Sequence, residues 1–153
     1  MKNYDNNQNY KNSLIKKAEN FCLSNKLRLT TIRKRVLEII LESNKPSKAY
    51  DILKKIKGIG SEKPPTVYRA LDFLLENGLI HKLNSNQSYI SCQHPNEHSE
   101  CFFLFCKVCK NISECCATEL SRVFKKTVKK AKFTDTKIHC EIIGTCDKCC
   151  KIQ

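Results

Sequence analysis

The sequence contains no apolar run that approaches the ~18 residues a helix needs to cross a bilayer. Residues 1–13, MKNYDNNQNYKNS, also lack the apolar core of a secretory signal. These two absences predict a cytoplasmic protein with no membrane-spanning segment. Acidic residues are scarce as well: 15 Asp and Glu stand against 28 Lys and Arg, which leaves a formal net charge of +13. That excess favours an anionic partner, nucleic acid or a membrane surface, but it identifies no site by itself.

The motifs that carry enzyme chemistry are also missing. We find no nucleophile triad, no glycine-rich phosphate-binding loop, no zinc-hydrolase motif and no internal repeat at a solenoid period. The sequence therefore predicts a protein that is not an enzyme. It does contain 11 cysteines. In a reducing cytosol such residues ligate metal more often than they form disulfides, so their spacing decides their role.

The first half of the chain has the pattern of helices followed by a small hairpin. Residues 1–13 are rich in Asn and predict a disordered tail. From Ser13 on, apolar residues recur at helical spacing in successive stretches, the last of which begins at Pro64 and ends at Gly78. Two short extended runs, 79–83 and 88–92, then flank a polar turn. This order predicts a winged helix-turn-helix DNA-binding domain over residues 14–92.

The second half differs in composition and pattern. Residues 93–100, QHPNEHSE, predict a polar hinge. Beyond the hinge, an apolar run at 101–106, helical spacing at 117–131 and an extended run at 137–143 indicate a small α/β module that spans 101–153. The expected fold class is therefore α+β, with an N-terminal winged helix-turn-helix domain followed by a small α/β domain.

Two Cys-x-x-Cys pairs in the second half carry the strongest chemical signal. They are Cys106 with Cys109 and Cys146 with Cys149, separated by residues 110–145. Each pair makes a chelating turn, and four thiolates complete the tetrahedral shell of a structural zinc ion. The alternative is a redox dithiol, but that motif is expected once, at a helix N-terminus inside a βαβ unit, and neither pair lies in one. The spacing thus favours a structural zinc site made of four cysteines.

With these cysteines identified, the segment KPPTVYRALDFLLENGLIHK (63–82) closely resembles the DNA-reading region of the ferric-uptake-regulator (Fur) superfamily, in its zinc-uptake-regulator (Zur) branch. The resemblance runs from about Leu29 to Cys149 and includes LTTIRKRVLEII, KAYDILKKI and both Cys-x-x-Cys pairs. Lys110 departs from it, because the family often has glycine after the first pair. The resemblance implies a dimeric, metal-dependent repressor with a winged helix, a hinge and a dimerisation domain, and it assigns structural zinc to the four cysteines.

The resemblance further implies a second, regulatory zinc site, so that each monomer binds two Zn²⁺. Its ligands map onto His81, Cys92, His98 and Glu114. Imidazole, thiolate and carboxylate together suit zinc, and the sulfur of Cys92 disfavours harder metals. Since the hinge differs in length from the family pattern, His94 and Cys101 stay open as alternatives to His98.

For DNA, the resemblance implies that Arg69 reaches base edges with Tyr68 nearby, and that Tyr50 adds a contact from the preceding helix. Thr66 is placed to touch phosphate. An arginine can donate two hydrogen bonds to O6 and N7 of guanine. A homodimer presents two such helices, so the expected partner is double-stranded DNA with an inverted-repeat operator. The function implied is a zinc-responsive repressor that controls zinc-uptake genes when its regulatory site is filled.

Other functions stay open at this point. A sensor of iron, another metal or peroxide from the same superfamily would share the DNA-binding half, although Cys92 argues against it. A thiol oxidoreductase using Cys106 and Cys109 would show reversible dithiol chemistry and no tightly bound zinc. A plain DNA-binding module would hold one structural zinc and sense nothing.

Overall fold

The structure, a computed structural model, describes residues 2–3, 8–43, 45–57, 63–95, 101–134, 136 and 138–151. Its contacts divide the chain into two compact units, one of Tyr4–Asn96 and one that joins Met1–Asn3 to Glu97–Gln153. The division falls inside the predicted hinge 93–100. Among the helices described, none combines the length and the apolar character that a membrane crossing requires.

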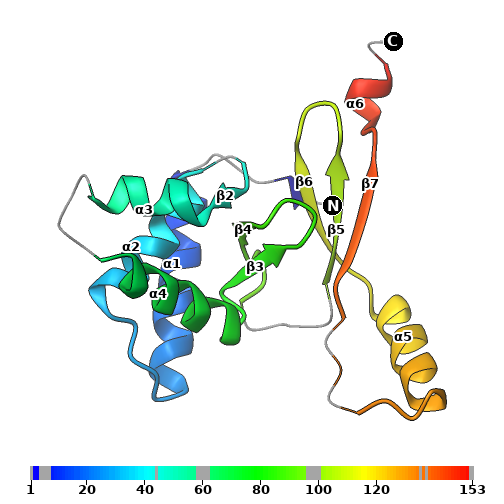
Figure 1. Ribbon diagram of the computed structural model, residues 1–153, viewed down its shortest axis with the longest axis horizontal. Coiled ribbons are helices and arrows are strands. Elements are labelled where there is room, and N and C mark those ends of the chain that lie inside the picture. The colour runs from blue at the N-terminus through cyan, green and yellow to red at the C-terminus, as the bar shows by residue number, and fades with distance from the viewer. Residues whose placement is uncertain are drawn as a thin grey trace. The chain divides into compact units, whose positions relative to one another are not determined.

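In the described part of the unit Tyr4–Asn96, the chain forms helices and a three-stranded sheet (Figure 1). The helices are α1 (Gln8–Ser24), α2 (Thr31–Glu42), α3 (Ala49–Lys57) and α4 (Pro64–Glu76), and the strands are β2 (Ser47–Lys48), β3 (Ile80–Leu83) and β4 (Ser88–Ser91). Strand β4 lies between β2 and β3 and pairs antiparallel with both. Helices followed by an antiparallel hairpin are the elements of a winged helix, as the sequence predicts.

Helix α4 begins and ends where its sequence requires. Pro64 and Pro65 occupy its first turn, where a backbone N–H would have no partner inside the helix. The helix stops at Asn77, and Gly78 follows with a φ of 62°, a left-handed conformation that glycine adopts without steric cost. One face of the helix is buried along its length by Val67, Ala70, Leu71 and Leu74. The opposite face is therefore left for solvent or a partner.

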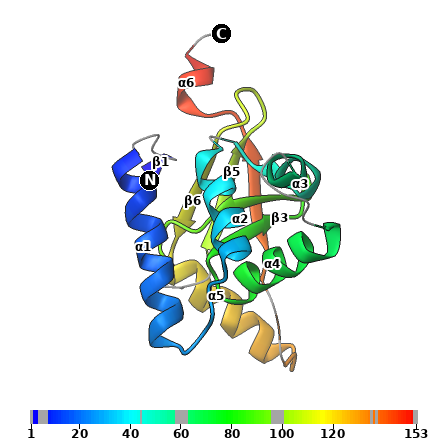
Figure 2. The ribbon, with the colours of Figure 1, turned by 90° about the vertical axis from the view of Figure 1, so that its left-hand side faces the viewer.

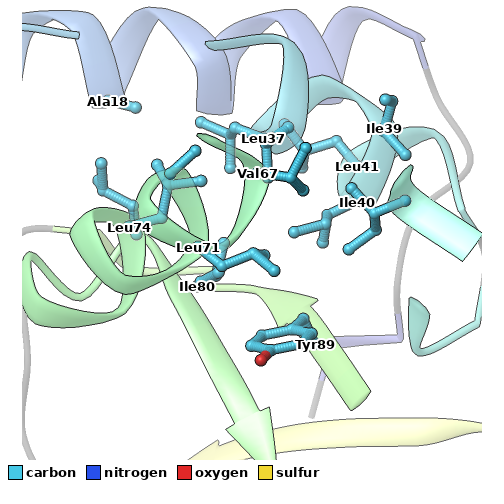
Figure 3. Packing of buried hydrophobic residues seen from close by; sticks show 14 of the residues in the cluster. Ala18, Leu37, Ile39, Ile40, Leu41, Val67, Leu71, Leu74, Ile80 and Tyr89 are labelled. Atoms are coloured by element: carbon cyan, nitrogen blue, oxygen red, sulfur yellow. The ribbon is translucent and has the colours of Figure 1, made fainter. Parts of the chain in front are cut away.

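The core of this unit forms where the helices meet the wing strands. Helix α2 lies between α1 and α4 (Figure 2). Figure 3 shows the side chains that converge there: Leu37, Ile40 and Leu41 from α2, Val67, Leu71 and Leu74 from α4, and Ile80 and Tyr89 from the wing strands. Burying so many aliphatic side chains gives the unit a core of its own, which fixes the position of α4.

Helix α1 begins earlier than the sequence predicts. The prediction of a disordered tail over 1–13 is wrong for residues 2–3, which form a short strand, and for residues 8–13, which form the first turns of α1. The physical reason for the early start of α1 is Tyr10, which packs against the core and donates a 2.5 Å hydrogen bond from its hydroxyl to Oε1 of Gln93. One aromatic anchor thus outweighs the Asn-rich composition around it.

Removing the Tyr10 hydroxyl is expected to destabilise this unit without unfolding it. Tyr10→Phe keeps the packed ring but deletes a hydrogen bond to Gln93, which is 4% exposed, so the free energy of unfolding should fall by about 1 kcal/mol. Urea unfolding followed by circular dichroism measures the loss. Ser13→Ala is the matched control, because it deletes an exposed hydrogen bond to the Tyr10 carbonyl. Equal losses in the two variants would contradict the anchoring role of Tyr10.

The other unit is built on a four-stranded sheet in the order β1-β6-β5-β7. Its strands are β1 (Lys2–Asn3), β5 (Cys101–Cys106), β6 (Ile112–Cys116) and β7 (Cys140–Gly144), and its helices are α5 (Thr118–Lys130) and α6 (Asp147–Cys150). Strand β5 pairs antiparallel with β6 and parallel with β7. The predicted runs at 101–106, 117–131 and 137–143 correspond to β5, α5 and β7, which confirms an α+β fold. The sequence does not predict strand β6, because its short sequence, ISECC, gives no clear alternation.

This second unit buries few apolar side chains. Among its described residues, the buried hydrophobic ones are Phe103, Cys106 and Ile112. Several large apolar side chains are instead exposed, namely Val108, Val123, Phe133, Ile142 and Ile143. A unit of this size with so small a core needs another source of stability, such as a metal or a partner subunit.

Candidate metal centre and DNA-reading surface

The two Cys-x-x-Cys pairs converge at one edge of the C-terminal sheet, where Figure 1 shows α6 and the turn between β5 and β6. Cys106 ends β5, and Cys109 lies in the turn that follows. Cys146 is the N-cap of α6, and Cys149 lies inside that helix. Because β5 and β7 run parallel and pair as far as Cys106 and Gly144, the segments that carry both cysteine pairs leave the sheet at the same edge.

Lys110 closes the first chelating turn. Its N–H donates to the carbonyl oxygen of Cys106 at 2.9 Å, and its φ is 62°. A left-handed conformation favours glycine, which the family often has at this position. The lysine of this chain adopts the same backbone conformation at some steric cost.

The four cysteine sulfurs lie close enough to share one ion, since all are within 4.8 Å of one another. The Sγ atoms of Cys109 and Cys146 are 3.8 Å apart. Zn–S bonds of about 2.3 Å place the sulfurs of a tetrahedral site about 3.8 Å apart, which is the same separation. The N–H of Cys146 also donates to Sγ of Cys106 at 3.4 Å, a contact that favours a thiolate. Four sulfurs at this spacing could hold zinc, whereas a redox dithiol would account for only two of them.

The sulfurs also influence one another electrostatically. Backbone N–H groups, first that of Cys146 and then that of Cys109, lower the pKa of Cys106 to about 6. A hydrogen bond with the Cys146 sulfur, together with burial and the other two sulfurs, raises the pKa of Cys149 to about 12. One thiolate forms readily, and its charge opposes ionisation of its neighbours. A divalent cation among the sulfurs would remove that opposition.

In the unit Tyr4–Asn96, the wing hairpin carries two of the predicted regulatory ligands on one face. His81 of β3 pairs with Ile90 of β4, and Cys92 follows Ile90 at the next position on the same side. Because side chains alternate along a strand, His81 and Cys92 lie on the same face of the hairpin. Cys92 is 2% exposed, and its sulfur accepts the N–H of His94 at 3.3 Å. The hairpin therefore presents an imidazole and a cysteine sulfur on one face.

Glu114, another predicted ligand, lies on β6 of the C-terminal sheet. It is 7% exposed and pairs with Phe103 of β5. Cys101, one of the alternatives for the fourth ligand, lies on the same face of this sheet, and its sulfur is within 4.8 Å of the Glu114 carboxylate. His98 lies outside the described residues. The sequence alone does not single out Cys101, because residue patterns do not encode the register between β5 and β6.

The residues predicted to touch DNA lie on α3 and α4. On α4, Arg69 is exposed and Tyr68 is 51% exposed, while Thr66 in the first turn is half-buried. On α3, Tyr50 is 63% exposed, and Nζ of Lys54 lies 4.4 Å from the centroid of its ring. Neither tyrosine is a core residue, so both side chains are accessible to a partner. The cation–π contact of Lys54 has no sequence signal beyond its helical spacing from Tyr50.

The chain combines a winged helix, whose helix α4 has an exposed face, with a sheet that carries four cysteines close enough to share a metal ion. These features define the class of metal-binding winged-helix proteins. The chain belongs to the ferric uptake regulator family, whose model matches residues 24–143. It is 34% identical to the zinc uptake regulation protein of Escherichia coli (strain K12) over 143 residues, which cover 92% of this chain and 83% of that protein.

Solved structures extend the comparison. The crystal structure of holo XcZur is 37% identical, with a TM-score of 0.86 over 92% of this chain and 99% of that one. A zinc uptake regulator complexed with zinc and DNA is 32% identical, with a TM-score of 0.83 over 93% of this chain and 96% of that one. Apo XcZur, also 37% identical and covering 93% and 99%, has a TM-score of only 0.55. The sequence identity to this chain is 37% for both forms, so the lower TM-score of the apo form reflects a difference in conformation between the holo and apo structures.

Proposed function

We propose that the protein is a zinc-responsive transcriptional repressor that binds inverted-repeat operators in double-stranded DNA as a homodimer and controls zinc-uptake genes. The observation that carries the proposal is likeness over at least 92% of the chain to zinc regulators, one of them solved with zinc and DNA. The protein acts by binding rather than by catalysis, in the cytoplasm, where its operators are.

The structural zinc belongs in the four-cysteine cluster. Cys106, Cys109, Cys146 and Cys149 are its ligands, and the 3.8 Å separation of two of their sulfurs supports this. The small core of the C-terminal unit supports it as well, because a metal that joins β5 to α6 closes the long loop between them. When bound, the zinc supplies folding free energy and no chemistry.

The regulatory zinc is held by His81, Cys92 and Glu114 and by a fourth ligand, for which the family resemblance gives His98 and the sequence offers His94 and Cys101 as alternatives. Soft and borderline donors in this set favour zinc over iron or manganese. Because the ligands belong to both units, filling the site favours one conformation of the chain. If that conformation binds DNA, zinc raises DNA affinity, and DNA raises zinc affinity by the same factor. The difference between holo and apo XcZur supports such a metal-dependent conformation.

DNA is read by the exposed face of α4. Arg69 donates to a guanine in the major groove, Tyr68 and Tyr50 add contacts, and Thr66 binds phosphate. The buried face of α4 fixes the helix on the core, so the exposed side chains are held in a defined orientation.

A second copy of the chain covers the apolar side chains that the C-terminal unit leaves exposed. They lie on α5, on the segment after it and on β7, and include Val123, Phe133, Ile142 and Ile143. Covering such a surface with the same surface of a second chain gives a two-fold dimer. Two α4 helices related by a two-fold axis match the two halves of an inverted repeat.

The test combines a zinc count with DNA binding. Purified protein should hold two zinc ions per monomer, and mild chelation should remove one of them together with affinity for an inverted-repeat operator at fixed salt. Cys92→Ala should bind one zinc and lose the zinc dependence of DNA binding. Cys22→Ala removes another cysteine that is 2% exposed in the same unit and is the matched control, expected to keep both properties.

The outcomes separate the alternatives. Zinc-dependent DNA binding that is unchanged in Cys92→Ala would contradict the regulatory site. One tightly held zinc with DNA binding indifferent to chelation would leave a plain DNA-binding module. Restoration of DNA binding by iron but not by zinc would indicate an iron sensor. A zinc-free protein with a reversible disulfide would indicate the oxidoreductase.

A further inference from the structure

Cys101 and Glu114 form a pair of metal-binding side chains within the C-terminal sheet. In the register of β5 and β6, Cys101 pairs with Cys116 and Phe103 pairs with Glu114. Cys101 and Phe103 are next-but-one neighbours on β5, so Cys101 and Glu114 occupy diagonal positions on one face. The Cys101 sulfur and a Glu114 carboxylate oxygen lie within 4.8 Å of each other.

This geometry suits two ligands of one zinc ion. A Zn–S bond of about 2.3 Å and a Zn–O bond of about 2.1 Å place sulfur and oxygen about 3.6 Å apart at a tetrahedral angle. The two atoms lie within 4.8 Å of each other on adjacent, paired strands, which is compatible with that separation. Glu114 is 7% exposed, and a buried carboxylate is stabilised by a cation bound to it.

We infer that Cys101 is a thiolate ligand of the regulatory zinc and takes the place that the family resemblance gives to His98. The inference rests on the proposed function, because it names a ligand of that same site. The supporting observation is the pairing of two strands of one sheet. Strand β5 begins at Cys101, and its register with β6 places the predicted ligand Glu114 beside that cysteine. The regulatory set then contains two sulfurs, from Cys92 and Cys101, with His81 and Glu114.

A second thiolate ligand changes which metal ions the regulatory site prefers. Soft sulfur donors favour zinc over iron and manganese, so two sulfurs sharpen the preference that Cys92 alone would give. The second thiolate must also lose its proton when the metal binds, which makes zinc affinity more dependent on pH than a site with one sulfur.

Cobalt substitution tests the inference through spectroscopy rather than repression. Full-length protein is chelated mildly until one zinc per monomer is left, and the emptied site is filled with Co²⁺. Thiolate-to-cobalt charge-transfer absorption grows with the number of cysteine ligands. Wild type should show the intensity of two thiolates and Cys101→Ser that of one, and zinc affinity should fall by at least about 100-fold, the upper end of the cost of losing an outer-shell partner.

Two controls accompany this variant. Cys115→Ser removes a cysteine from the opposite face of the same sheet, since Cys115 pairs with Phe102, and it should leave the spectrum and the zinc affinity unchanged. His98→Ala should do the same. Far-ultraviolet circular dichroism of the zinc-loaded variants checks that Cys101→Ser is folded.

The outcomes distinguish the inference from the function on which it rests. An unchanged cobalt spectrum in Cys101→Ser, or loss of the absorption in His98→Ala alone, overturns the role of Cys101 and leaves the zinc sensor intact. Failure of Cys92→Ala to alter the cobalt spectrum overturns the regulatory site itself. Halved charge-transfer intensity in Cys101→Ser, with Cys115→Ser and His98→Ala like wild type, supports the inference.

Discussion

Cys146→Ser is expected to lose the structural zinc and, with it, the fold of the C-terminal unit, while the unit Tyr4–Asn96 stays folded. Structural zinc contributes about 10–16 kcal/mol of apparent binding free energy in small zinc domains. That is as large as the whole stability of a typical domain, about 5–15 kcal/mol. A serine in place of one thiolate leaves a site with three ligands, too weak to hold the metal against competing chelators.

The contrast between the two units explains why only one should unfold. The N-terminal core is formed by side chains from α1, α2, α3, α4 and the wing strands, none of which is a metal ligand in the four-cysteine cluster. In the C-terminal unit, Cys106 is one of the three buried hydrophobic residues among those described, so the metal site is itself part of the core. Losing the metal therefore removes much of what orders β5 and β7.

Amide hydrogen exchange and zinc analysis measure this result. Exchange protection should disappear from β5 and β7 and persist in α2 and α4, with less than one zinc per monomer retained. Cys150→Ser is the matched control, because Cys150 is exposed, lies beside Cys149 in α6 and is outside the cluster. Protected β5 and β7 amides in a zinc-free Cys146→Ser protein would show that the sheet does not depend on the metal.

The four-cysteine cluster could be predicted from the sequence because its information is local. Each Cys-x-x-Cys pair is a chelating turn by itself, and only the convergence of the two turns requires a fold. Helix α4 was predictable for a similar reason, since Pro64 marks its start, Gly78 marks its end and the apolar spacing lies between them. In both cases short-range chemistry agrees with the tertiary structure.

Other features depend on long-range pairing that residue patterns do not encode. The first turns of α1 form because the Tyr10 hydroxyl meets Gln93, which is remote in sequence. Strand β6 forms by pairing with β5, although its own five residues show no alternation of apolar and polar positions. The juxtaposition of Cys101 and Glu114 follows from that same register, so the sequence could offer Cys101 only as one alternative among several.

Arg69→Ala is expected to abolish recognition of the operator without loss of stability. The side chain is exposed on α4, whereas the residues that anchor the helix lie on the opposite face. A bidentate arginine–guanine pair contributes about 1–3 kcal/mol of discrimination, and a dimer makes two such contacts, so specific affinity should fall by about 2–6 kcal/mol. Titration of operator and scrambled DNA at one salt concentration measures the loss, and thermal unfolding should be unchanged.

Arg69→Lys separates base reading from charge. Lysine keeps the positive charge but lacks the planar fork that donates two hydrogen bonds, so binding to scrambled DNA and its salt dependence should match wild type while operator preference falls. Lys63→Ala, at the N-cap of the same helix, is the complementary control. Lys63 is expected to contact phosphate, and loss of such a contact should weaken binding to operator and scrambled DNA equally. A uniform loss in Arg69→Lys, with the operator preference retained, would place Arg69 on the phosphates and leave another residue of α4 to read the bases.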